Sequence, residues 1–250
     1  MAIFLILHGL PGHGNQWRDV VEALAPHRVL TPTFVGFEWE TEWRGFPSTP
    51  DHARQILESV EAEDADDLVC VAWSFGCHPL LAALSEGLAC RSAVLIEPSS
   101  DSYLDGADRR LFKQDASLAF ANLFAEISSA DDERLAELAF KATGSASAWD
   151  DLHDNRREPF ISSASAMRRA FLSGAQPMEI PRPLLQRIKT PTHVMIGTES
   201  RNMFKVAASQ LAKLLPAAEL HIEQGRNHLW PVTQPELLAS DLRKITDLWQ

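Results

Sequence analysis

The sequence lacks a cysteine framework, and this excludes a small protein held together by disulfide bonds. Its three cysteines, Cys70, Cys77 and Cys90, form no CxxC pair, and no cluster of Cys and His has the spacing of a zinc site. We therefore expect reduced thiols, no metal and a cytoplasmic location. No signal peptide is expected, because the first apolar run, residues 2–7, is short and no basic residue precedes it.

Basic residues and long apolar runs are scarce as well. Lys and Arg number 23 against 34 Asp and Glu, which gives a net charge of −11 with His neutral. This balance disfavours binding to nucleic acid or to an anionic membrane. No apolar run approaches the roughly 20 residues that span a bilayer. With 250 residues, of which 45% are hydrophobic, the chain is expected to be a soluble globular protein, as a monomer or a homodimer.

The chain instead shows short apolar runs that alternate with amphipathic stretches. Strands that are apolar throughout and joined by helices are typical of a parallel sheet covered on both faces. Right-handed crossovers then give a doubly wound α/β fold. Strands are predicted at residues 2–7, 27–31, 68–72, 93–96, 192–196 and 220–222, and helices at 15–25, 50–62, 75–88, 203–215 and 235–248.

One long interval interrupts this alternation. About 95 residues without a strand signal separate the fourth apolar run from the fifth, and an unstructured loop of that length is improbable in a compact protein. Helical periodicity at residues 111–128, 131–141 and 162–172 fills much of the interval. We expect residues 99–189 to form an inserted helical cap over a core made of residues 1–98 and 190–250.

The third apolar run leads into the pentapeptide AWSFG and then directly into a predicted helix. Ser74 lies at its centre, with Ala72 two residues before it and Gly76 two residues after it. Small residues at these positions allow a strand and a helix to meet in a sharp turn that exposes a nucleophilic serine. The alternative is a serine that only caps the helix. The strand before it and the helix after it favour the nucleophile.

Two further segments supply the groups that a nucleophilic serine needs. The backbone N–H groups of Leu10, in the HGLPG segment, and of Phe75 are positioned to form an oxyanion hole. His8, in the same segment, is expected to be structural. His228 follows the last predicted strand, where a general base would reach the serine from the carboxyl edge of the sheet.

Together, the segments HGLPG, AWSFG and GRNHLWPVTQPELL resemble those of the α/β-hydrolase superfamily, with the serine before the histidine. The Trp that precedes Ser74, the HG loop and Trp17 resemble the carboxylesterases related to pimeloyl-ACP methyl ester esterase. The resemblance implies an α/β-hydrolase fold and a serine hydrolase that cleaves a small ester or thioester through an acyl-enzyme. It implies no metal and no organic cofactor.

The acidic member of the triad departs from the family pattern. The family usually has an aspartate three residues after the glycine that ends the fifth strand, and here that residue is Ser200. Glu97, at the end of the fourth strand, is the first candidate for a replacement, because some superfamily members keep their acid there. Glu199 is the second candidate. In the third case no acid is present, and Ser74 and His228 act as a dyad.

Residues close to the serine and the histidine along the chain, together with Phe34 after the second predicted strand, predict an apolar substrate pocket. Four aromatic and aliphatic side chains are expected to line it and to bind an apolar acyl or alkyl group. Two other functions remain open: a hydrolase of the C–C bond in a diketone-like substrate, and a binding protein that has lost catalysis. The expected pocket residues are Trp73, Trp230, Leu229 and Phe34.

Overall fold

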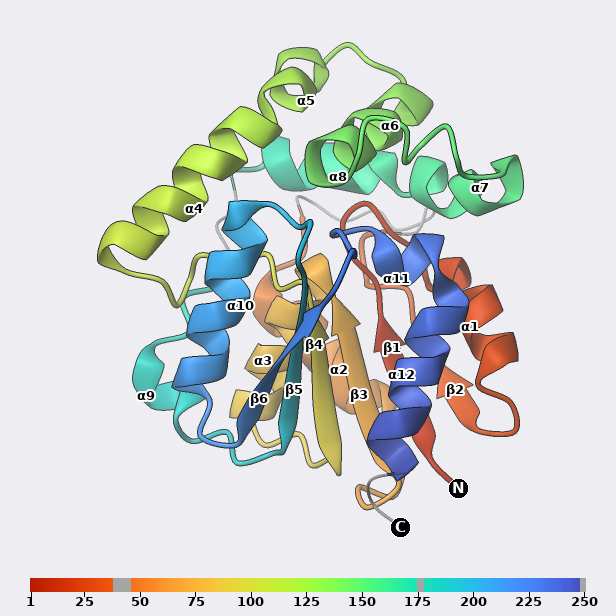
Figure 1. The fold of residues 1–250 in the computed structure, drawn as a ribbon, viewed down its shortest axis with the longest axis vertical. Helices are drawn as coiled ribbons and strands as arrows, with labels where there is room; N and C mark the ends of the chain where they lie inside the picture. Colours follow the sequence, from red (N-terminus) through yellow and green to blue (C-terminus); the bar gives the residue numbers. More distant parts are fainter. Residues whose placement is uncertain (38–45, 175–177, 248–250) are drawn as a thin grey trace.

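The computed structural model describes residues 1–37, 46–174 and 178–247. At its centre is a six-stranded sheet in the order β2-β1-β3-β4-β5-β6, with every neighbouring pair parallel (Figure 1). Each predicted strand is present, and the α/β class is confirmed. The strands are β1 (Ile3–Leu7), β2 (Arg28–Leu30), β3 (Leu68–Trp73), β4 (Ser92–Ile96), β5 (Thr192–Gly197) and β6 (Ala218–Glu223).

Helices cover both faces of the sheet, as the apolar strands require. Alternate residues of β1 pack in opposite directions, Phe4 and Ile6 into one apolar cluster and Leu5 and Leu7 into the other. The first cluster is covered by the 3₁₀ turn Gly14–Trp17, by α1 (Arg18–Ala23) and by α12 (Pro235–Asp247). The second is covered by α2 (Thr49–Ser59), α3 (Cys77–Ser85) and α10 (Asn202–Leu214).

The topology creates a crevice at the carboxyl edge of the sheet. The chain passes from β1 outward to β2 and then returns to β3 on the other side of β1. The loops that follow β1 and β3 therefore leave the sheet toward opposite sides, which is where ligands bind in open α/β sheets. Ser74 follows β3 directly, and His8 follows β1 directly.

Five helices lie above this edge in Figure 1, and no strand occurs among the described residues between β4 and β5. The single helix predicted at residues 111–128 is divided into two at Phe120. A further helix, α9 (Arg182–Leu185), instead packs beside α3. The five helices are α4 (Gly106–Ala119), α5 (Ala121–Glu126), α6 (Asp132–Thr143), α7 (Asp154–Ser162) and α8 (Ala164–Leu172).

The helices above the edge are tied to the sheet layer by specific contacts. The Asp115 carboxylate, on α4, accepts a hydrogen bond from the Arg201 guanidinium at 2.6 Å and one from the Met203 N–H at 3.0 Å. This carboxylate therefore satisfies a free N–H in the first turn of α10. Within the described ranges, no helix is both long and apolar enough to cross a membrane.

Candidate active site

Ser74 lies in a strained turn between β3 and the helices that follow. Its φ is 54°, in the left-handed region that non-glycine residues rarely adopt. A 3₁₀ turn (Ser74–Gly76) leads from it into α3 without a break. A Cβ at Gly76 would lie 2.6 Å from the His8 carbonyl oxygen, so glycine is needed at this close approach. This is the turn that the AWSFG pentapeptide predicts.

His228 lies 154 residues after Ser74 in the chain and contacts it in the structure. Its Nε2 lies 3.0 Å from the Ser74 Oγ, and the His228 side chain is 3% exposed. The Phe204 ring of α10 stacks on the imidazole, with centroids 3.7 Å apart and planes 13° apart. The Trp73 indole N–H donates to the His228 carbonyl oxygen at 2.9 Å. These two contacts fix both the ring and the backbone of the histidine.

Glu97 faces the other side of the His228 ring. It directly follows β4, has a φ of 54° and is fully buried. Its Oε1 accepts hydrogen bonds from the Gly197 N–H at 2.8 Å and from the Ser200 hydroxyl at 2.7 Å. Its Oε2 lies 3.5 Å from the His228 Nδ1, and neither atom has another partner among the described residues. The structure thus brings Ser74, His228 and Glu97 into one line.

Glu199, the second candidate acid, is not part of this line. It is exposed, and its backbone N–H donates to the Arg226 carbonyl oxygen at 2.9 Å. Its neighbour Ser200 is buried, and the Ser200 hydroxyl donates a hydrogen bond to the Glu97 carboxylate. The position that carries an aspartate in the family pattern therefore supports the carboxylate that β4 supplies.

The HGLPG segment passes directly beside the serine. A Cβ at Gly9 would lie 3.0 Å from the Trp73 ring and 3.3 Å from the Ser74 Cβ. His8 is fully buried; its Nδ1 lies 2.8 Å from the Gly9 carbonyl oxygen, and its Nε2 accepts the Phe34 N–H at 2.9 Å. Burial lowers the pKa of His8 to about 3, so this histidine is neutral and holds two loops together. Its structural role agrees with the sequence prediction.

A pocket of about 250 Å³ opens at Ser74. Leu10, Trp73 and Leu229 line it, and the last two are among the four residues expected there. The helix α6 supplies residues that the sequence did not single out. A Cβ at Gly144, at the end of α6, would lie 2.3 Å from the Leu229 Cδ1, so α6 packs closely on the histidine loop. The remaining lining residues are Pro11, Ser74, Ala139, Phe140, Thr143 and His228.

The two other residues expected in the pocket, Phe34 and Trp230, are not part of its lining. Phe34 is 1% exposed and packs its ring against His8 and Phe75. Trp230 is also 1% exposed, and its ring lies under the Arg226 guanidinium at 4.3 Å. For Trp230, closeness to His228 along the chain did not place the side chain in the pocket, because successive side chains of a tight turn leave the backbone in different directions.

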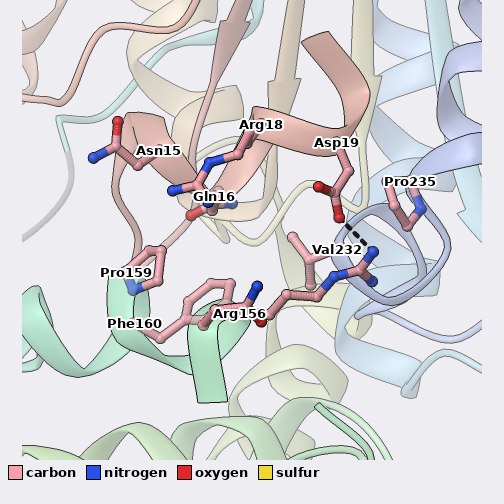
Figure 2. A pocket seen from close by; sticks show the side chains of 10 residues that line it. Asn15, Gln16, Arg18, Asp19, Arg156, Pro159, Phe160, Val232 and Pro235 are labelled. Atoms are coloured by element: carbon pink, nitrogen blue, oxygen red, sulfur yellow. Dashed lines mark ion pairs between the residues drawn. The ribbon is translucent and has the colours of Figure 1, made fainter. Parts of the chain in front are cut away.

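A second hollow lies between the 3₁₀ turn Gly14–Trp17, α1 and α7 (Figure 2). Its volume is about 430 Å³, larger than that of the pocket at Ser74. Its lining includes neither Ser74 nor His228, and an ion pair between Arg156 of α7 and Asp19 of α1 crosses it. This hollow therefore lies apart from the line of Ser74, His228 and Glu97, between α7 and the sheet layer.

Comparison with known proteins agrees with this geometry. A family model described as the alpha/beta hydrolase family matches residues 4–241. The chain belongs to the alpha/beta hydrolase family. The family predicted from the HGLPG, AWSFG and GRNHLWP segments is thus confirmed, and the chain is an α/β-hydrolase.

Several relatives of this α/β-hydrolase are esterases. The carbendazim hydrolyzing esterase of Nocardioides sp. (strain SG-4G) is 40% identical over 79 residues, which are 30% of this chain and only 33% of that esterase. The pimeloyl-(acyl-carrier protein) methyl ester esterase of Vibrio vulnificus (strain YJ016) is 26% identical over 241 residues, 95% of this chain and 91% of the relative. The structure of esterase RhEst1 from Rhodococcus sp. ECU1013 shares the fold, with a TM-score of 0.75 at 19% identity, over 98% of this chain and 90% of that one.

Proposed function

We propose that this α/β-hydrolase is a serine hydrolase that cleaves a carboxylic ester or thioester with an apolar acyl or alkyl group. The observation that carries the proposal is the buried line from the Ser74 Oγ to the His228 Nε2 at 3.0 Å and from the His228 Nδ1 to the Glu97 Oε2 at 3.5 Å. A nucleophile, a base and a group that orients the base are what acyl transfer needs. The esterase relatives support the same class of substrate.

In the first half of the reaction, the Ser74 Oγ attacks the carbonyl carbon of the substrate while the His228 Nε2 takes the hydroxyl proton. The negative charge moves to the carbonyl oxygen, which the N–H groups of Leu10 and Phe75 stabilise. When the tetrahedral intermediate collapses, its bond to the leaving group breaks. The leaving alcohol or thiol takes the proton from His228, and the acyl group stays on Ser74.

In the second half, His228 removes a proton from a water molecule, which attacks the acyl-enzyme carbonyl. The same oxyanion hole stabilises the second tetrahedral intermediate. Collapse breaks the bond to the Ser74 Oγ, which regains its proton from His228. The carboxylic acid leaves, and the enzyme returns to its starting state.

Glu97 orients His228 and stabilises the imidazolium that forms during each half. Because the Gly197 N–H and the Ser200 hydroxyl occupy its Oε1, its Oε2 is directed at the His228 Nδ1. Glu97 is the acid in this proposal, and Glu199 takes no part.

The helical segment of residues 99–189 is proposed to act as a cap that shapes the pocket and controls access to it, over a core of residues 1–98 and 190–250. Within it, α6 supplies Ala139, Phe140 and Thr143 to the lining of the pocket at Ser74. Most groups that line the pocket are apolar, which favours an apolar acyl or alkyl group over a sugar or a phosphate.

The proposal is tested with p-nitrophenyl acetate, butyrate and octanoate and with a fluorophosphonate probe. We expect hydrolysis of at least one ester, together with one probe molecule on Ser74, located by mass spectrometry of the labelled peptide. Labelling without any ester hydrolysis would instead favour the C–C bond hydrolase. The absence of both hydrolysis and labelling would contradict the proposed enzyme and would favour the binding protein.

Ser200 acts as a positioning residue, and we expect Ser200→Ala to lower kcat about tenfold, the effect of one lost hydrogen bond. KM is expected to stay within about twofold, because Ser200 holds Glu97 and is not part of the lining of the Ser74 pocket. Steady-state kinetics on p-nitrophenyl butyrate gives both constants. Ser200→Thr keeps the hydroxyl and is expected to restore most of kcat. A change confined to KM would contradict the positioning role.

A further inference from the structure

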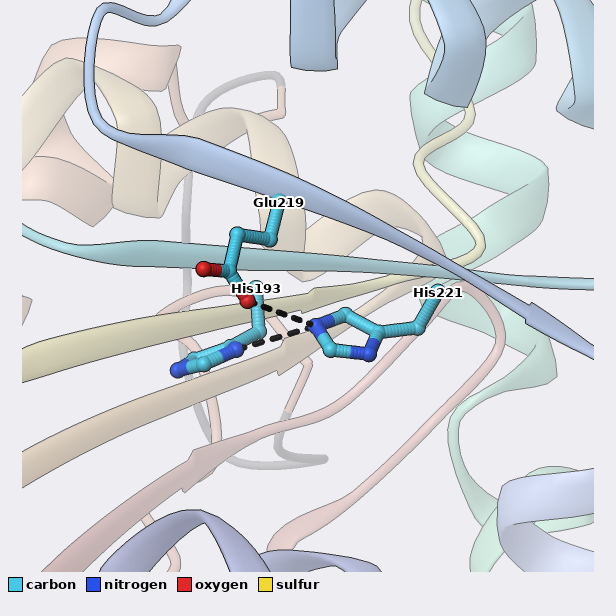
Figure 3. A group of neighbouring side chains, drawn as sticks. All are labelled: His193, Glu219 and His221. Atoms are coloured by element: carbon cyan, nitrogen blue, oxygen red, sulfur yellow. Dashed lines mark hydrogen bonds and ion pairs between the residues drawn. The ribbon is translucent and has the colours of Figure 1, made fainter. Parts of the chain in front are cut away.

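A second cluster of polar side chains lies on the outer strands of the sheet (Figure 3). It joins His193 of β5 to Glu219 and His221 of β6. His193 and Glu219 are directly paired in the parallel register, and residues two apart on β6 point to the same face. None of the three takes part in the proposed reaction, and His193 is four residues before Gly197, about 13 Å along the strand.

The distances within the cluster suit a shared metal ion. The His193 Nδ1 and the His221 Nε2 lie 3.0 Å apart, and the Glu219 Oε2 lies 3.9 Å from the same Nε2. Two nitrogens 3.0 Å apart, each about 2.1 Å from one ion, would subtend an angle of about 90° at it. That angle is the one between neighbouring ligands in octahedral and square-planar coordination.

We propose that His193, His221 and Glu219 bind one divalent transition-metal ion, with Ni²⁺, Cu²⁺ and Zn²⁺ as the fitting class. Two imidazoles and a carboxylate are the ligands that these ions take in proteins, and they leave positions open for water. The Glu219 side chain is 75% exposed, so it is free to rotate toward the nitrogens.

The spacing of histidines along the sequence does not reveal this cluster. The two histidines belong to different strands and meet only because β5 and β6 are neighbours in the sheet. The ion would cross-link the edge strand β6 to β5. Binding to the folded state alone would then raise the unfolding temperature.

The test is isothermal titration with Ni²⁺ and with Zn²⁺, on protein made without a polyhistidine tag and stripped with EDTA. We expect one ion per chain, and a Kd at least tenfold weaker in His221→Gln. The matched control is His153→Gln, which removes an exposed histidine at the start of α7 and should bind like the wild type. Equal affinity of the wild type and His221→Gln would overturn the proposal.

Thermal unfolding supplies a second readout that does not depend on catalysis. Saturating Ni²⁺ is expected to raise the unfolding temperature of the wild type and of His153→Gln by several degrees, and that of His221→Gln by clearly less. Scans without metal show whether His221→Gln is folded. If His221→Gln is unfolded, the same comparison with the wild type is made with His221→Ala and with Glu219→Gln. An equal shift in all variants would show binding elsewhere and reject the site.

Discussion

Ser74→Ala is expected to lower kcat for ester hydrolysis by about 10⁴- to 10⁶-fold, the largest effect of any single substitution in this chain. The substitution removes the atom that forms the acyl-enzyme and leaves the surrounding turn intact. What remains is the stabilisation that the oxyanion hole and substrate binding give to direct attack by water. The measurement is steady-state hydrolysis of p-nitrophenyl butyrate, with labelling by the fluorophosphonate as a second readout.

His228→Ala is expected to cost nearly as much as Ser74→Ala. The double variant should be no worse than either single one, because the two residues act in the same proton transfer. Losses that multiply in the double variant would show that His228 and Ser74 act independently. Retention of more than a tenth of wild-type kcat in Ser74→Ala would remove Ser74 from the role of nucleophile. Near-ultraviolet circular dichroism checks that each variant keeps its packing.

Glu97→Gln is expected to lower kcat by about 10²- to 10⁴-fold. The reason lies in the two donors that hold the Glu97 Oε1, the Gly197 N–H and the Ser200 hydroxyl. In the variant these donors require the amide oxygen, so the amide NH₂ takes the place of Oε2 and faces the His228 Nδ1. The histidine must then carry its proton on Nε2, and in that tautomer it cannot accept the proton of Ser74.

Glu199→Gln is the matched control, because it makes the same chemical change at an exposed position in the loop after β5, the strand that follows β4. We expect its kcat to stay within about twofold of the wild type. A loss in Glu199→Gln with none in Glu97→Gln would assign the acid to the loop after β5. If neither substitution changes kcat, Ser74 and His228 act as a dyad.

The sequence predicted the fold well because the information lies in short local patterns. The segment of β3, for example, is apolar throughout, as a strand that is buried on both faces must be. Prediction failed where no such pattern exists. The helix α7 contains Pro159 and has no apolar stripe, so its periodicity gave no sign of a helix.

By itself, the sequence determined the six strands and the family and predicted the pair Ser74 and His228, because each depends on a few consecutive residues. Only the tertiary structure brought Glu97 to His228, placed α6 over the serine and paired His193 with His221. These contacts join residues that lie far apart in the chain. They are set by which strands are neighbours, by their register and by how the helices pack on them, and no local spacing in the sequence carries that information.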